Sequence, residues 1–248
     1  MPKSPDLNRR RRADAARLVA DVLRRGIDRG DRADRLDEQR LADEFGVSRN
    51  AIRDALALLS AEGRIDRGPR VGTRVARRRA EHGIDELCGL SETLAGYGCV
   101  RNEIRVATIV RAPAAVARRL HLEPSADVVY IERLRFLDQE PVSLDLTYLV
   151  PDVGVPLLGL DLENHDVFGL IEHSTGRPLH SARHSVEAAT ADPHSAAILD
   201  VPPGAALLLI ERLTALGPER RPVDLEYIRM RSDRITLHAT ALRAASEH

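Results

Sequence analysis

Apolar residues recur with helical spacing in the first part of the chain. Residues 9–28 carry one apolar face, and Gly26 and Gly30 mark its end. Asp37 stands where an N-cap is expected for a second helix, which Gly46 ends. Ser48 is placed to cap a third helix that runs to about Gly63. The apolar positions of the three helices are Ala16, Val19, Ala20, Leu23 and Ile27, then Leu41 and Phe45, then Ile52, Ala55, Leu56 and Leu59.

The pattern changes to period two after these helices. Residues 64–66 and 71–75 read as two short strands around the turn signal Gly68-Pro69. A charged, weakly patterned stretch at 77–89 reads as a linker. Beyond it, the expected strands are 101–111, 128–137, 141–150, 179–190, 207–216, 222–230 and 235–242, and the expected helices are 113–121, 164–174 and 192–199.

An internal repeat lies within the strand-rich part. YIERLRFLDQEPVSLDL (130–146) and LIERLTALGPERRPVDLEY (209–227) share Ile-Glu-Arg-Leu, a turn and a Pro-Val pair. Two copies are too few for a solenoid, so they predict a pseudo-two-fold domain around one antiparallel sheet. The expected fold class is therefore α+β in two domains, with boundaries at 1–76, 77–89 (linker) and 90–248.

Composition restricts the classes of protein. The apolar share is 43% and the aromatic share 3%, so the cores are expected to consist of Leu, Val, Ile and Ala. No apolar run approaches the roughly 20 residues of a membrane span, and the basic N-terminus has no apolar segment behind it, as a secretory signal would. Cys88 and Cys99 lack metal-ligand spacing and are expected to be incidental thiols in a reducing cytoplasm.

The net charge of −1 conceals an asymmetry between the two parts of the chain. Residues 1–80 contain 21 Lys and Arg against 13 Asp and Glu, whereas the remainder contains 16 against 25. This division favours a first domain that binds a polyanion and a second domain with a different task. A single protein with an arginine-rich head is the alternative.

The segment LADEFGVSRNAIRDALALLSAEG (41–63) has the form of a helix-turn-helix. In that motif the second helix enters the major groove, and its N-terminal residues face the bases. Here these residues are Ser48, Arg49, Asn50 and Arg53. Arg can bind guanine bidentately and Asn can bind adenine, while Arg64, Arg67, Arg70 and Arg74 are placed for phosphate or minor-groove contacts. An ordinary solvated face is the alternative for any single arginine.

At these residues the chain resembles the winged helix-turn-helix of GntR-family bacterial repressors. Asp37 stands in place of the family's capping Ser, and Gln39 stands where the family has a DNA-contacting Arg, beside Arg40. The first glycine of the family's wing is replaced by Arg70. The expected DNA-binding residues are Asp37, Arg40, Ser48, Arg49, Asn50, Arg53, Arg70, Gly72, Thr73 and Arg74.

The second part resembles the UTRA sensor domain of the HutC subfamily, which has a chorismate lyase-like fold. The resemblance is carried by IERLRFLDQEPVSLDLTYLVP, VFGLIEHSTG, ILDVPPGAALLLIERL and RPVDLEYIRMRSDR. It implies that a small effector binds between the two halves and changes the affinity for DNA. The implied effector residues are Arg133, Arg135, Asp145, Tyr148, Asp166, Phe168, Asp224, Glu226 and Met230.

Two departures from relatives that sense phosphosugars bear on the effector. Asp166 and Phe168 stand where those relatives have Ser and Tyr, and Met230 replaces a common Tyr. A carboxylate beside a phosphate is repulsive, so we expect an effector that is not a sugar phosphate and that has a cationic or hydroxyl group facing Asp166. Cross-strand ion pairing is the alternative for Arg133, Arg135 and Asp145.

Together these features predict a ligand-responsive transcriptional regulator. We expect a cytoplasmic bacterial repressor, associated with the nucleoid when bound to its operator, that acts as a homodimer on palindromic double-stranded DNA. No catalytic residue, metal or cofactor is expected, and His173, His180 and His184 are expected at the surface or the edge of the core. An enzyme on the lyase-like fold is one alternative, although fold alone does not supply activity. A constitutive DNA-binding protein with a non-functional sensor is another.

Overall fold

The structure is a computed structural model that describes residues 5–68, 72–76 and 79–242. The chain divides into two compact units, Met1–Arg79 and Ala80–His248. The two-domain α+β prediction is confirmed, and each unit is described by itself below. Among the described residues, no helix combines the length and apolar character needed to cross a membrane.

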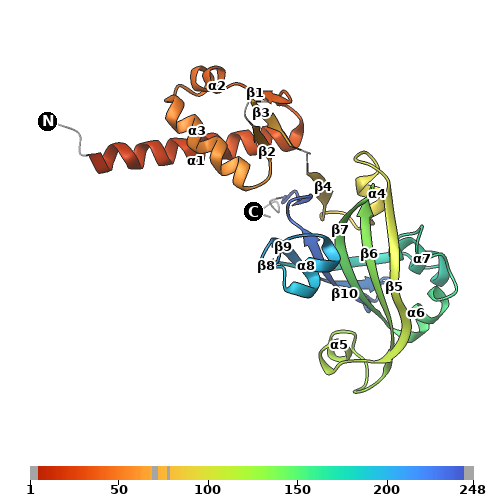
Figure 1. Ribbon diagram of the computed structural model, residues 1–248. Helices are drawn as coiled ribbons and strands as arrows, with labels where there is room; N and C mark the ends of the chain where they lie inside the picture. The colour runs from red at the N-terminus through yellow and green to blue at the C-terminus, as the bar shows by residue number, and fades with distance from the viewer. Residues whose placement is uncertain (1–4, 69–71, 77–78, 243–248) are drawn as a thin grey trace, which may run out of the picture. The chain divides into compact units, whose positions relative to one another are not determined.

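In its described residues, the first unit contains three helices and a small sheet (Figure 1). Its helices are α1 (Pro5–Arg29), α2 (Glu38–Phe45) and α3 (Arg49–Ala61). Its strands are β1 (Arg35–Leu36), β2 (Ile65–Gly68) and β3 (Gly72–Val75), in the order β1-β3-β2. The predicted hairpin is thus present, and β1 adds a strand that was not predicted.

The core of the first unit is made by the predicted apolar stripes. Leu23 of α1 and Ile52, Leu56 and Leu59 of α3 are completely buried. The same cluster contains Ala16, Val19, Ala20, Ile27, Leu36, Leu41, Ala42, Ala55 and Ile65. Burial of this continuous apolar surface fixes α3 against α1, so that the polar face of α3 points outward.

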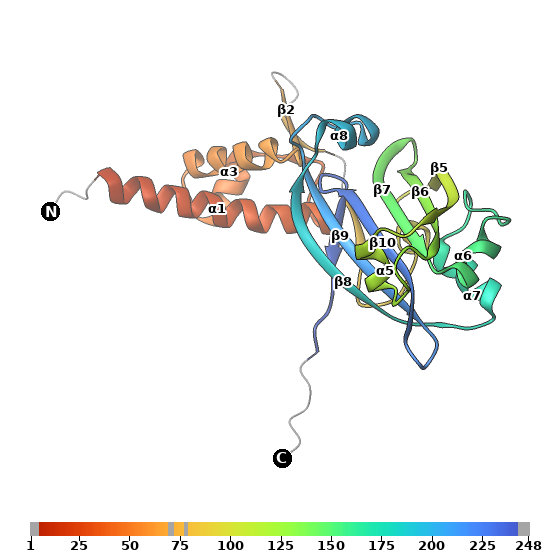
Figure 2. The same cartoon turned by 90° about the horizontal axis from the view of Figure 1, so that it is seen from below.

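The second unit is built around a six-stranded antiparallel sheet in the order β5-β6-β7-β10-β9-β8. Its strands are β5 (Val100–Arg111), β6 (Asp127–Leu137), β7 (Glu140–Leu149), β8 (Leu179–Thr190), β9 (Ala206–Leu216) and β10 (Arg221–Arg231). Figure 2 shows β8 and β9 as long neighbouring strands that curve together. The two copies of the sequence repeat form the hairpins β6–β7 and β9–β10, which meet along β7 and β10, so the pseudo-two-fold prediction is confirmed.

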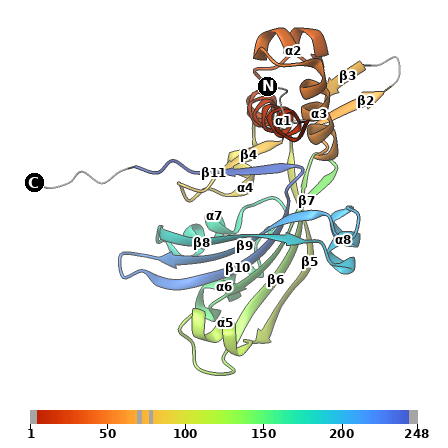
Figure 3. The ribbon, with the colours of Figure 1, turned by 90° about the vertical axis from the view of Figure 1, so that its left-hand side faces the viewer.

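Within residues 80–242, the helices that flank this sheet are α4 (Leu90–Leu94), α5 (Ala114–Arg119), α6 (Pro151–Leu157), α7 (Val167–Thr175) and α8 (Pro193–Leu199). The largest apolar cluster joins residues of α5, α6 and α7 to the sheet, whereas α8 packs in a separate cluster with β6, β7 and β9. Figure 3 shows α8 and α5 at separate places along the sheet. The helix predicted at 164–174 begins at Val167, after Asp166, and neither α4 nor α6 was predicted.

The predicted linker at 77–89 needs correction. Ala80–Gly83 form a strand, β4, which pairs in parallel with β11 (Ile235–His238). The second unit therefore begins at Ala80 rather than at residue 90. The charged sequence hid this strand because its partner lies some 150 residues further along the chain. The last strand, predicted for 235–242, ends at His238 because His238 pairs with Gly83, the last residue of β4.

Candidate functional site

The turn between α2 and α3 positions the exposed end of α3. Gly46 ends α2 in the left-handed conformation (φ 62°), which a residue without a side chain adopts at no steric cost. Ser48 then caps α3, and its hydroxyl oxygen accepts a hydrogen bond from the Ala51 backbone N–H at 3.3 Å. Arg49, Asn50 and Arg53 are exposed at this end of the helix. The residues predicted to contact DNA bases therefore form one exposed edge of α3, and the apolar face of the same helix is buried. We call this exposed edge the reading edge.

Side chains from the first turn of α2 contact both arginines of this edge. The Nε of Arg53 donates to Glu38 Oε2 at 2.8 Å, and Arg67 of β2 donates to the other oxygen of Glu38 at 3.1 Å. The Nε of Arg49 donates to the amide oxygen of Gln39. These contacts use the Nε of Arg49 and Arg53, while the terminal Nη groups are the pair that can reach O6 and N7 of guanine.

Of the neighbouring residues Gln39 and Arg40, it is therefore Gln39 that contacts an arginine of α3. Gln39 also donates to Asp43 at 2.8 Å, which fixes the orientation of its amide. Arg40 is exposed and lines a pocket of about 130 Å³ with Asp31 and Glu44. Asp37 is occupied as the cap of α2, since its carboxylate accepts the Arg40 backbone N–H at 2.8 Å. The role of Asp37 in the structure is thus to fix the helix.

The residues of the wing hairpin that were predicted to bind DNA differ in their exposure. Thr73 is buried in the central strand β3, between Leu36 of β1 and Arg67 of β2, so its side chain does not lie on the exposed surface as predicted. Arg74, the next residue, points the opposite way and is exposed. Gly72 has φ 78° and lies close under the Arg35 guanidinium. Arg70 lies outside the described residues.

In the second unit, charged side chains converge on one face of the sheet. Arg133 of β6 is directly opposite Asp145 of β7, and Arg212 of β9 is directly opposite Glu226 of β10. These two pairs occupy equivalent places in the two copies of the repeat. All four side chains are buried, and that of Arg133 is only 1% exposed. Cross-strand ion pairing, the alternative weighed for this group, is therefore present.

The distances between oppositely charged atoms differ within this group. Arg212 Nε donates to Glu226 Oε2 at 2.6 Å, and Thr147 donates to the other oxygen of Glu226 at 3.0 Å. Arg133 Nη2 lies 3.9 Å from Glu226 Oε1 and 4.0 Å from Asp145 Oδ2. Glu226 is therefore the central anion of the buried group, and it holds both Arg133 and Arg212.

Asp224 and Glu226 differ in protonation although both are completely buried. Burial and the nearby charge of Glu226 raise the pKa of Asp224 well above its usual range. Burial also acts to raise the pKa of Glu226, but Arg212 and Arg133 outweigh it and lower that pKa. Of the two carboxyl groups, Asp224 is thus the one that holds a proton more readily and Glu226 the one that favours its charged form, as expected for two acids that share a buried site.

Helix α7 brings two predicted residues to this face. The Arg212 guanidinium lies over the Phe168 ring, 4.3 Å from its centroid, and Asp166 forms an ion pair with Arg135. Met230 lies on the same face but is buried in an apolar cluster with residues of β4, α4 and β11. Arg133, Arg135, Asp145, Asp166, Phe168, Asp224 and Glu226 thus form one group in the structure.

Tyr148 does not join that group. It lies three residues after Asp145 on the same strand, and side chains alternate between the faces of a sheet. Its ring instead contacts Tyr130 and Tyr227, at centroid distances of 5.0 and 6.5 Å. The predicted role of Tyr148 beside Arg133 is therefore corrected by its position on the opposite face.

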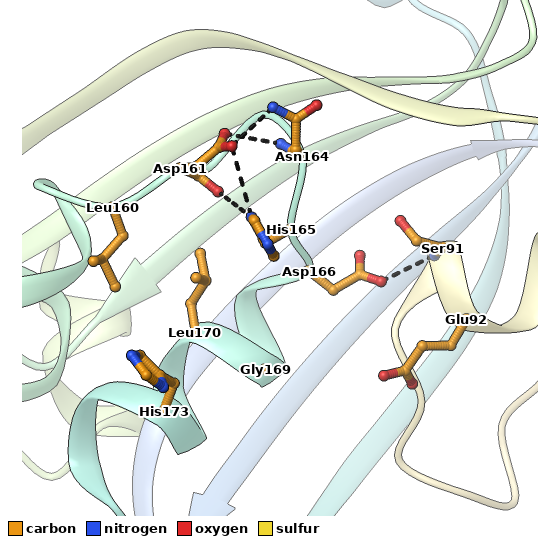
Figure 4. Close-up of a pocket in the computed structure, with 10 residues that line it drawn as sticks. All are labelled: Ser91, Glu92, Leu160, Asp161, Asn164, His165, Asp166, Gly169, Leu170 and His173. Atoms are coloured by element: carbon orange, nitrogen blue, oxygen red, sulfur yellow. Dashed lines mark hydrogen bonds and ion pairs between the residues drawn. The ribbon is translucent and has the colours of Figure 1, made fainter.

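A cavity of 590 Å³ lies where α4 and α7 approach each other (Figure 4). Of the predicted effector residues, only Asp166 lines it. Three of its lining side chains are acidic, and none is Lys or Arg. The lining residues are Ser91, Glu92, Leu160, Asp161, Asn164, His165, Asp166, Gly169, Leu170 and His173.

Sequence reasoning missed most of this lining. The segment around Asp161 precedes α7 and has no periodic pattern, and α4 is only five residues long. The cluster of polar residues Asp161, Asn164 and His165 before a helix was the available signal. Within the described ranges, no three His, Cys, Asp or Glu side chains are grouped so that they could hold a metal ion.

Comparisons with known proteins assign both units. Residues 15–75 match the family of bacterial regulatory proteins called the gntR family, and residues 98–236 match the UTRA domain. The histidine utilization repressor of Pseudomonas putida is 29% identical over 188 residues, which are 75% of this chain and 74% of that protein. An HTH-type transcriptional regulator of Mycobacterium tuberculosis is 26% identical over 92% of this chain and 84% of its own length.

Solved structures support the same fold. The crystal structure of PhnF from Mycobacterium smegmatis superimposes with a TM-score of 0.67 and 23% sequence identity, covering 91% of this chain and 100% of PhnF. At this identity the likeness concerns the fold alone. It agrees with the helices, the wing and the large antiparallel sheet described above.

Proposed function

The chain belongs to the bacterial regulators of the gntR family that carry a UTRA domain, and from this premise we propose that it is a repressor whose DNA affinity is set by a small-molecule effector. The observation that carries the proposal is the N-terminal end of α3. There Ser48 caps the helix, Arg49, Asn50 and Arg53 are exposed, and Ile52 on the opposite face is completely buried. A helix fixed in this way can enter the major groove with those three residues facing the bases.

The contacts from α2 support the choice of reading residues. Gln39 and Glu38 hold the Nε atoms of Arg49 and Arg53, which reduces the freedom that each side chain would lose on binding. The free ends of the two guanidinium groups are then arranged to bind guanine. Asn50 between them is the candidate for an adenine contact.

We propose that the protein acts as a homodimer on a palindromic operator. Two-fold symmetric proteins bind helix-turn-helix half-sites about one helical turn apart, so operator symmetry mirrors protein symmetry. A wild-type chain that binds a single half-site as a monomer, with the affinity of the full site, would contradict this part of the proposal.

The proposed effector site is the cavity between α4 and α7. Its acidic lining by Glu92 and Asp161 favours a molecule with cationic or hydroxyl groups, and Leu160 and Leu170 provide apolar surface. Binding there would change the population of arrangements of the first unit that fit the operator, which is how an effector alters DNA affinity without touching DNA.

The DNA-binding part is tested by selecting high-affinity duplexes from random DNA with the full chain. Fluorescence anisotropy then compares wild type with Arg49→Ala and Arg53→Ala. Each variant should lose about 1–3 kcal/mol of binding free energy on the selected duplex. Arg111→Ala, which removes an exposed arginine from β5 in the other unit, is the charge-matched control. If both α3 variants bind like the control, α3 is not the reading helix.

The sensor part is tested with a panel of amines, polyols and sugar phosphates in a thermal-shift assay, since a ligand that binds only the folded state raises the melting temperature. Compounds that raise it are added to the operator complex. Asp161→Asn and Glu92→Gln should weaken this response and leave operator binding unchanged in the absence of ligand. Stabilisation that is unaffected by both variants would place the effector elsewhere.

A further inference from the structure

Helix α1 begins well before the part of it that packs in the core of the first unit. The helix runs from Pro5 to Arg29, and the first buried residue described in it is Ala16. The preceding residues, 5–15, make about three turns of helix. Among the side chains described there, those of residues 8–12 and 14 are exposed, and those of residues 13 and 15 are half-buried. Burial of apolar surface therefore does not account for these turns.

The exposed turns carry four consecutive arginines, residues 9–12. Arg12 pairs with Asp54 of α3, and its Nε lies 2.8 Å from Asp54 Oδ2. The other three, Arg9–Arg11, form no ion pair with any residue that the structure describes. We call these three residues the arginine run. Because like charges close together on a helix repel each other, the arginine run favours an anion from outside the chain.

Two ion pairs define the direction of α1 relative to α3. Arg12 pairs with Asp54, and Arg24 pairs with Glu62 at 2.6 Å. Between these pairs the chain advances along both helices in the same direction, so the two helices begin at the same end of the unit. Figures 1 and 2 both show the start of α1 projecting beyond the start of α3. In a helix-turn-helix the N-terminal end of the second helix faces DNA, so the arginine run projects on that side.

Asp54 connects the arginine run with the reading edge. It follows Asn50 by four residues on α3, so the two side chains lie one turn apart on the same side of the helix. The Asp54 side chain is 44% exposed, and its negative charge would repel nearby phosphates. Arg12 offsets this charge. The arginine run, which directly precedes Arg12, is therefore a surplus of positive charge beside the reading edge.

We propose that the arginine run is a second DNA-binding surface, which contacts phosphates of the duplex beside the major groove that α3 enters. The inference rests on the proposed DNA-binding function and adds to it a contact outside the reading edge and the wing. The ligand is the backbone of double-stranded DNA, whose dense negative charge complements three unpaired arginines on one helix. Phosphate contacts carry no sequence information, so this surface raises the affinity for every duplex and fixes the position of the unit on its site.

The test uses the full chain with the selected duplex and with a scrambled duplex of the same composition. In the variant Arg9→Gln/Arg10→Gln/Arg11→Gln, fluorescence anisotropy should show that both duplexes bind about tenfold or more weakly at about 0.15 M salt. The ratio of the two affinities should remain that of wild type. The slope of log affinity against log salt concentration should become shallower by about 1 for each phosphate contact that is lost.

The matched control removes the same charge from other exposed arginines of α1. It is Arg17→Gln/Arg25→Gln/Arg29→Gln, and all three positions come after Ala16, where the helix packs in the core. The control should keep the salt slope of wild type. A loss of affinity and of slope in the arginine-run variant that is no larger than in the control would overturn the proposal.

A second variant separates loss of charge from loss of folding. Arg9→Lys/Arg10→Lys/Arg11→Lys keeps three positive charges and should keep the salt slope of wild type, because lysine also binds phosphate. If circular dichroism shows that the glutamine variant folds poorly, the three glutamine substitutions are made singly, and each should reduce the slope by up to about 1. Weaker binding of the selected duplex alone would also contradict the proposal, since phosphate contacts act on every sequence.

Failure of this proposal can be distinguished from failure of the proposed function. A chain that binds the selected and the scrambled duplex equally, and binds both more weakly without the arginine run, would refute the sequence-specific regulator and retain the second surface. A chain that prefers the selected duplex and is unaffected by loss of the arginine run would do the reverse.

Discussion

Arginine–carboxylate pairs serve opposite purposes in the two units. On the edge of α3, the side chains of Arg53 and Glu38 are 59% and 28% exposed, whereas those of Arg133 and Glu226 in the sheet are 1% and 0% exposed. Exposed pairs are worth little, so the contact between Glu38 and the Nε of Arg53 adds little stability and leaves the terminal Nη groups of Arg53 available for a base. Removal of one partner from a buried pair strongly destabilises the protein, because the other charge is left buried and uncompensated. The first arrangement suits recognition, and the second suits a fixed internal structure.

The largest expected effect breaks the buried side of this comparison. Glu226→Ala leaves both Arg212 and Arg133 without their shared anion and should lower the free energy of unfolding by about 3–5 kcal/mol. Urea denaturation followed by circular dichroism measures the loss. Glu211→Ala is the matched control, because Glu211 precedes Arg212 on β9 but pairs with the partly exposed Arg119. Similar losses in the two variants would show that burial does not separate these pairs.

A smaller effect concerns a buried group that stays neutral. Burial, aided by Arg212 and Arg135, lowers the pKa of His82 to about 4, and its ring nitrogen lies 2.7 Å from the Thr93 hydroxyl. The unfolded chain takes up this proton near pH 6.5 and the folded chain only near pH 4. Stability contributed by neutral His82 is therefore complete above pH 6.5 and is lost as the pH falls through this window.

His82→Asn should remove this part of the pH dependence. At pH 5.5 the wild type should have lost about 1.4 kcal/mol through His82, and the variant should not show this loss. The measurement is the difference in unfolding free energy between pH 7.5 and pH 5.5 for both proteins. An identical difference in the two would mean that His82 is protonated in the folded state at pH 5.5.

Features that depend on local sequence patterns could be predicted in both units. The helices of the first unit and the repeated hairpins follow from local periodicity and caps, and Asp37, Gly46 and Ser48 act as expected. The buried group was also within reach, because Arg133 and Asp145 recur in the second repeat as Arg212 and Glu226. The position of Tyr148 on the other face could have been predicted by counting, since it lies three positions after Asp145 on the same strand.

Contacts between distant segments could not be predicted in this way. The pairing of β4 with β11, the position of Ser91 beside Asp166 and the cavity near α4 all depend on residues far apart in the chain. Apart from the polar residues before α7, no local pattern marks them, because short helices such as α4 depend on tertiary packing and not on intrinsic propensity. The same holds for Gln39, whose contact with Arg49 is visible only once α2 and α3 are packed.

The next smaller expected effect follows from removal of the Ser48 cap of α3. Ser48→Ala removes the acceptor for the Ala51 N–H and should lower stability by about 1 kcal/mol, with a loss of DNA affinity as α3 frays. Ser48→Asp restores a cap, so it should recover the stability, but its charge should repel the DNA phosphates and reduce affinity further. Urea denaturation and anisotropy separate the two effects. Recovery of both properties in Ser48→Asp would show that position 48 does not approach the DNA backbone.

The smallest expected effect concerns the exposed side of the comparison. Glu38→Gln weakens the contacts with Arg53 and Arg67 and should change the unfolding free energy by less than about 1 kcal/mol. Removal of a negative charge beside the reading edge should raise the affinity for all DNA. At the same time Arg53 loses the carboxylate that fixes its Nε, so the ratio of affinities for the selected and a scrambled duplex should fall.

The variant Glu44→Gln tests whether Glu38 orients Arg53 or acts only through its negative charge. Glu44 is also on α2 and pairs with an arginine, Arg32, but it does not contact α3. Both variants should bind scrambled DNA more tightly than wild type, because each removes one negative charge from the same unit. Only Glu38→Gln should lower the affinity ratio. An equal ratio in the two variants would mean that Glu38 acts through its charge alone and does not position Arg53 for base recognition.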